Sequence, residues 1–146
     1  MVAMRWQLEE RRARAVAPGE WGREILVSQV VLSAWAHANR LALPRPAIEV
    51  LLRHACAAAG PPPGPAERLR RVLETLARDP APLVCLADTP GALDPFSQGE
   101  GYVAAAHDAS KNLLEHVTEA QWLRIREAAR SQLAAMVLRG GGVSCV

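Results

Sequence analysis

The adjacent residues His107 and Asp108 are the pair in this chain whose types and spacing could do chemistry. An imidazole and a neighbouring carboxylate can bind the same divalent metal ion, which then generates hydroxide from bound water. Such a site needs further ligands. His37 or His54 could supply a second imidazole, but no aspartate follows Asp108. His107 and Asp108 are therefore weak metal candidates, and we expect no bound cofactor.

The His107-Asp108 dipeptide is similar to the central signature of the HD-type metallophosphohydrolases, a family of all-helical enzymes. The resemblance covers these two residues of the chain. It implies a small metal-dependent hydrolase in which both side chains bind the metal ion. We keep this activity as the alternative to a non-catalytic function.

Other residues that could do chemistry do not form a catalytic pattern. The serines lie outside any Gly-x-Ser-x-Gly turn, and the chain has no phosphate-binding Gly-x-x-x-x-Gly-Lys loop. His54 and Cys56 are two residues apart on an expected helix, so their side chains diverge by about 200°. The sequence therefore favours a protein that is not an enzyme.

The composition predicts a single all-α domain. The chain has 146 residues, of which 50% are hydrophobic and 22% charged, with one Phe and one Tyr. Its apolar residues are dominated by Ala, Leu and Val, and Ala and Leu are strong helix formers. A net charge of +2 is too small to indicate nucleic-acid binding by itself.

Proline and glycine divide the chain into pieces of helical length, which predicts a compact bundle of five or six helices over residues 1–146. Two capping boxes predict helix starts, Ser97 with Glu100 and Thr118 with Gln121. The expected helices cover residues 1–16, 20–41, 46–59, 66–78, 98–116 and 119–138. Between them we expect a Pro/Gly-rich linker at 60–65, a loop at 79–97 and a flexible tail at 140–146.

The expected helix at residues 20–41 is apolar around most of its circumference, which is typical of a central helix or of one at a subunit interface. It is too short, and too often interrupted by polar residues, to span a membrane. We therefore expect other protein subunits or self-association as the partner, and no membrane. The candidate interface residues are Trp21, Val27, Val31 and Trp35.

Arginine supplies every basic residue except Lys111. Arginines that fall on two expected helices could contact nucleic-acid phosphates or an acidic partner, because the guanidinium group matches both in geometry. The candidates are Arg68, Arg71 and Arg78 on one helix and Arg124 and Arg130 on another. The last two helices could also form a helix-turn-helix, which makes a DNA-binding regulator a further alternative.

The leading hypothesis is thus a non-catalytic helical subunit or adaptor of a larger assembly. The three cysteines are an odd number without close spacing, which fits neither a disulfide framework nor a zinc site. The first twenty residues lack the apolar core of a secretory signal. We therefore expect a cytoplasmic protein.

Overall fold

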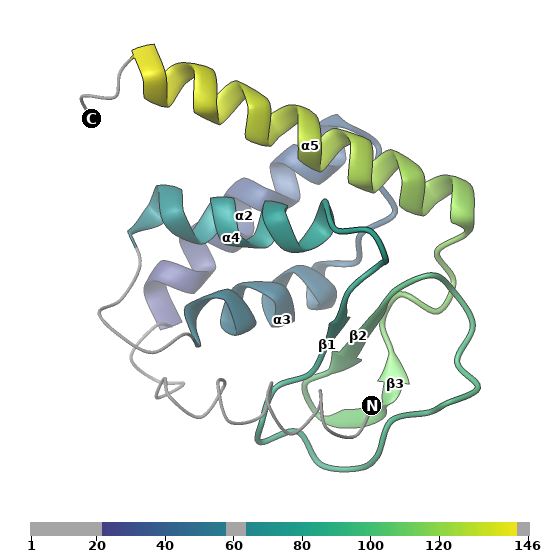
Figure 1. The fold of residues 1–146 in the computed structure, drawn as a ribbon. Helices are drawn as coiled ribbons and strands as arrows, with labels where there is room; N and C mark the ends of the chain where they lie inside the picture. Colours follow the sequence, from purple (N-terminus) through teal and green to yellow (C-terminus); the bar gives the residue numbers. More distant parts are fainter. Residues whose placement is uncertain (1–21, 58–63, 143–146) are drawn as a thin grey trace.

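The computed structural model describes residues 22–57 and 64–142. In these ranges the chain forms four α-helices and a sheet of three strands (Figure 1). The elements are α2 (Gly22–Ala38), α3 (Arg45–Cys56), α4 (Pro65–Leu76), β1 (Leu83–Val84), β2 (Tyr102–Ala105), β3 (Asp108–Asn112) and α5 (Glu119–Gly142). β2 lies in the middle of the sheet, parallel to β1 and antiparallel to β3.

The expected all-α bundle of five or six helices is wrong. Residues 98–116 do not form a helix, because they contain β2 and β3, which are joined by a tight turn at Ala106 and His107. The expected loop at 79–97 also contains β1. All four residues of β2 are buried. This alanine-rich segment has a helical propensity, but it forms a strand because β2 is buried between β1 and β3 and against α3.

The side chain of Asn112 holds the end of the hairpin in place. Its Oδ1 atom accepts hydrogen bonds from the backbone N–H groups of Val103 (3.0 Å) and Leu114 (2.9 Å). Its Nδ2 group donates to the carbonyl oxygen of Gly101 at 2.9 Å and to the hydroxyl of Ser97 at 3.0 Å. Asn112 is only 5% exposed, so these bonds satisfy a polar group that burial would otherwise destabilise.

The two predicted capping boxes have opposite outcomes. The box at the start of α5 is confirmed, because Gln121 N–H donates to Thr118 Oγ1 at 3.1 Å and Thr118 N–H donates to Gln121 Oε1 at 2.9 Å. The box at Ser97 is wrong, since no helix begins there and the next element is β2. Its hydroxyl accepts a hydrogen bond from Asn112 instead.

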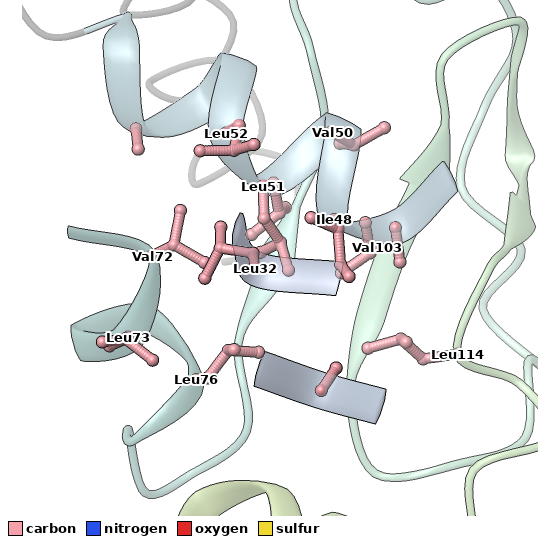
Figure 2. Close-up of a cluster of buried hydrophobic side chains, with 14 of the residues drawn as sticks. Leu32, Ile48, Val50, Leu51, Leu52, Val72, Leu73, Leu76, Val103 and Leu114 are labelled. Atoms are coloured by element: carbon pink, nitrogen blue, oxygen red, sulfur yellow. The ribbon is translucent and has the colours of Figure 1, made fainter. Parts of the chain in front are cut away.

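The helices pack around α3. α2 and α4 both contact α3, α5 lies across α4, and α3 packs against β2 (Figure 1). Figure 2 shows side chains of these elements meeting in one core, with Leu51 of α3 near Leu32 of α2 and Val72 of α4. The helix α5 contributes Trp122, Ile125 and Ala129 to this core, and all three are buried.

Some expectations concern residues that the structure does not describe. The expected helix at residues 1–16, the side chain of Trp21 and most of the linker at 60–65 lie outside the described ranges. α5 extends to Gly142, so the three glycines of the expected tail belong to the helix, and residues 143–146 lie outside the described ranges. None of the helices in the described ranges is both long and apolar enough to cross a membrane.

Candidate interaction surface on α2

The candidate metal ligands His107 and Asp108 lie in the hairpin turn and at the start of β3, not on a helix. The Asp108 carboxylate accepts hydrogen bonds from the Ser110 N–H (3.0 Å) and hydroxyl (2.7 Å), which hold the pKa of this carboxyl below its usual value. Within residues 22–57 and 64–142, no three His, Cys, Asp or Glu side chains come together as a metal site would require. The hairpin therefore offers no geometric support for an HD-type centre.

Internal hydrogen bonds also occupy the irregular part of the hairpin around Ala109. Tyr102 donates its hydroxyl to the carbonyl oxygen of Ala109 at 2.6 Å and accepts a hydrogen bond from Asp94 N–H at 3.1 Å. Ala109 N–H donates to the carbonyl of Pro90 at 2.8 Å. Burial raises the pKa of the Tyr102 phenol. These contacts give Tyr102 a structural role.

The candidate arginines on α4 lie against neighbouring helices. Arg68 is 4% exposed, and its Nε group donates to Ser28 Oγ of α2 at 3.0 Å. Arg71 donates from Nη1 to the carbonyl oxygen of Ala55, near the end of α3, at 3.0 Å, and from Nε to Glu67 at 3.0 Å. Both side chains thus connect helices within the protein.

The candidate arginines on α5 contact carbonyl groups beyond the ends of other helices. Arg130 donates to the carbonyl of Ala77 at 3.2 Å, and Arg124 donates to that of Asn39 at 3.3 Å. Arg126, on the same helix, donates to the carbonyl of Arg78 at 3.2 Å. Helix ends leave carbonyls without intrahelical partners, and guanidinium groups satisfy them well. Arg68, Arg71, Arg124 and Arg130 therefore each have a hydrogen-bond partner within the protein.

α2 has an apolar buried face and an apolar exposed face. Its buried side contributes Ile25, Leu32 and Ala36 to the core. The opposite side, here called the α2 face, consists of Leu26, Val27, Val30, Val31 and Ala34, all of which are exposed. The four larger side chains are between 47% and 61% exposed. Half of the large hydrophobic side chains exposed in the described part of the chain lie on this one helix.

An apolar groove adjoins the α2 face. It has a volume of about 150 Å³, and residues of three helices line it. They are Val31, Leu32 and Trp35 of α2, Leu69 and Leu73 of α4, and Gln132 and Met136 of α5. Val31 belongs to both the groove and the α2 face, so the two form one continuous surface. Of the predicted interface residues, Val27 and Val31 are exposed and Trp35 is half-buried in the groove wall.

The last turns of α5 add apolar surface that the sequence analysis missed. Val137 is 71% exposed and Leu138 is 77% exposed, next to Met136 in the groove. Three successive apolar residues cannot all face one side of a helix. The run from Met136 to Leu138 is the signal that could have indicated this exposure.

Comparison of the chain with family models, with curated proteins and with solved structures found no match. Function is therefore inferred from the geometry of the chain itself.

Proposed function

We propose that this protein is a non-catalytic subunit or adaptor of a larger assembly and that it binds its partner through the α2 face. The exposure of Leu26, Val27, Val30 and Val31 side by side on one helix carries this proposal. Single exposed aliphatic residues are common on protein surfaces, but contiguous apolar patches mark interaction sites.

The composition of α2 supports the same conclusion. The helix carries no charged residue between Glu24 and His37. The centres of protein interfaces are depleted of charged residues, whereas ordinary exposed helix faces are rich in them. The neighbouring groove provides a recess that a partner's apolar side chain would fill. An interface centred on α2 would remove both features from water.

Two further observations bear on this proposal. Cys56 and Cys85 are both buried, and burial raises the pKa of the Cys56 thiol, so Cys56 is an inert thiol of the kind found in reducing compartments. We therefore place the assembly in the cytoplasm.

Contact with nucleic-acid phosphates stays a prediction, because four of the five candidate arginines have hydrogen-bond partners within the protein.

Site-specific photo-crosslinking in the cells that make the protein tests this proposal. A photoreactive residue at Val30 should give a discrete crosslinked product, and one at the exposed polar position Glu127 on α5 should not. Val27→Glu, combined with the label at Val30, should abolish the product because it places a charge in the interface. Equal labelling at the two positions, or a product that resists Val27→Glu, would contradict an interface on α2.

A further inference from the structure

We propose that the partner on the α2 face is a second copy of this chain, whose own α2 packs antiparallel across a two-fold axis between Val30 and Val31. This inference rests on the proposed function, because it names the occupant of the same surface. It specifies which residues meet and in which direction the two helices run.

The α2 face has the symmetry that such an interface needs. A two-fold interface uses the same patch on both chains, so the patch must be complementary to itself. Val27 and Ala34 lie at equal distances on either side of the proposed axis. They are seven positions apart, about two turns, so both point outward along the middle of the face. The larger Val27 would therefore meet the partner's Ala34, and Val30 and Val31 would each pack on their own copies.

The charges at the two ends of α2 favour the antiparallel direction. Glu24 lies in the first turn with Arg23 beside it, whereas His37 in the last turn and Arg40 beyond it make the other end basic. Antiparallel packing brings Glu24 towards the basic end of the other helix. It also places the positive end of each helix dipole beside the negative end of the other. Parallel packing would place the two basic ends together.

The segment that precedes α2 is a poorer occupant of this face. Residues 1–21 lie outside the described ranges, and six of the ten residues at 5–14 are charged. Covering an uncharged aliphatic face with such a segment would remove charged groups from water without partners on α2. A second α2 instead offers the same uncharged aliphatic surface.

Light scattering after size exclusion of the full chain tests the proposal. The wild type should have twice the mass of one chain, and Val30→Glu should lose the dimer. Leu123→Glu is the matched control, because Leu123 is an exposed aliphatic residue on α5 and outside the α2 face. This variant should stay dimeric. A monomeric wild type, or a dimer that survives Val30→Glu, would overturn the proposal.

Cysteine crosslinking tests the direction and register, and it does not depend on the fold tolerating a buried charge. In a background with Cys145→Ser, Val30→Cys should form a disulfide between two chains under mild oxidation. Val27→Cys should not, because antiparallel packing separates the two copies of position 27 by about 10 Å along the helices, beyond disulfide reach. Crosslinking at both positions would indicate parallel helices and overturn the proposal, as would the absence of crosslinking at both.

These outcomes separate the proposed dimer from the proposed function. A product at Val30 in cells whose mass is twice that of one chain supports both proposals. A product of another mass, with a monomeric purified protein, keeps the interface on α2 and overturns the second copy as its occupant. The absence of any product at Val30, with a monomeric protein, overturns both.

Discussion

The side-chain carbonyl of Asn112 accepts a hydrogen bond from the backbone N–H of Val103 at 3.0 Å. A side chain thus takes the place of a backbone acceptor in the pairing of β2 with β3. The register between β2 and β3 is irregular between Ala104 and Ala105, so some backbone groups lack the partners that regular strand pairing would provide. Asn112 and Tyr102 bind several of these groups, so the hairpin depends on two side chains.

Asn112→Ala should strongly destabilise the protein. The change would leave the buried N–H groups of Val103 and Leu114 and the carbonyl of Gly101 without this partner. Each unsatisfied buried group costs about 1–3 kcal/mol, so we expect a loss of about 3 kcal/mol or more in the free energy of unfolding. Urea unfolding followed by circular dichroism measures it.

Lys111→Ala is the control for this prediction, because Lys111 is exposed and adjacent in sequence. It should change the free energy of unfolding by less than about 0.5 kcal/mol. An Asn112→Ala variant as stable as this control would show that the hairpin does not depend on the amide.

Tyr102 should make the protein sensitive to alkali. Burial raises the pKa of its phenol in the folded state, whereas the unfolded value is about 10. Above that pH the phenol loses its proton in the unfolded chain before it does so in the folded protein. The contribution of Tyr102 to the free energy of unfolding should therefore be fully present below about pH 10 and be lost as pH rises through the folded pKa. Because the chain has one tyrosine, ultraviolet absorbance reports the ionisation directly.

Tyr102→Phe provides the comparison for the alkaline titration. It removes the donor to Ala109 and should lower stability at neutral pH by about 1–3 kcal/mol. It should also reduce the decline above pH 10. If both proteins lose stability equally across the alkaline range, another group is responsible.

The two capping boxes show how far local sequence determines this fold. Thr118 and Gln121 precede a row of apolar residues with helical spacing, and the helix forms there. Ser97 and Glu100 satisfy the same pattern, but Gly99 has a φ of +95° and the residues after it form the buried strand β2. The two glycines at 99 and 101 were the local warning against a helix. The burial of β2 against α3 is a tertiary effect that no local pattern contains.

The candidate surface was predictable in part. The apolar circumference of α2 indicated a central or interfacial helix, but with apolar residues on both sides it could not indicate which side remains exposed. The arginines were a harder case, because a guanidinium group suits phosphates and carbonyls alike. The carbonyl that Arg124 contacts is 85 positions away and the one that Arg130 contacts is 53 away, so only the folded chain identifies these partners.

Adjacent arginines on α4 should differ in their effect on stability. Arg71→Ala removes a half-buried contact to the carbonyl of Ala55 in α3, and we expect a loss of about 1 kcal/mol or more. Arg70→Ala removes surface ion pairs with Glu67 and Glu74, which should contribute less than about 1 kcal/mol. Thermal unfolding of both variants gives the comparison. A larger loss in Arg70→Ala would contradict the structural role of Arg71.

Gly99→Ala should destabilise the loop that leads into β2. The φ of +95° at this position is strained for any residue with a side chain, at a cost of about 1–3 kcal/mol. The added Cβ would also lie 2.8 Å from the backbone carbonyl oxygen of Leu114, which cannot rotate away as a flexible side chain could. We therefore expect a clear decrease in the melting temperature, measured by calorimetry.

Gly64→Ala is the matched control for this substitution. Gly64 precedes α4 with an ordinary negative φ of −69°, and nothing lies within 4 Å of an added Cβ. Replacing glycine by alanine at such a site restricts the unfolded chain, which offsets the weaker capping by alanine. The melting temperature should therefore change little. Equal decreases in the two variants would mean that neither the positive φ nor the contact with Leu114 constrains position 99.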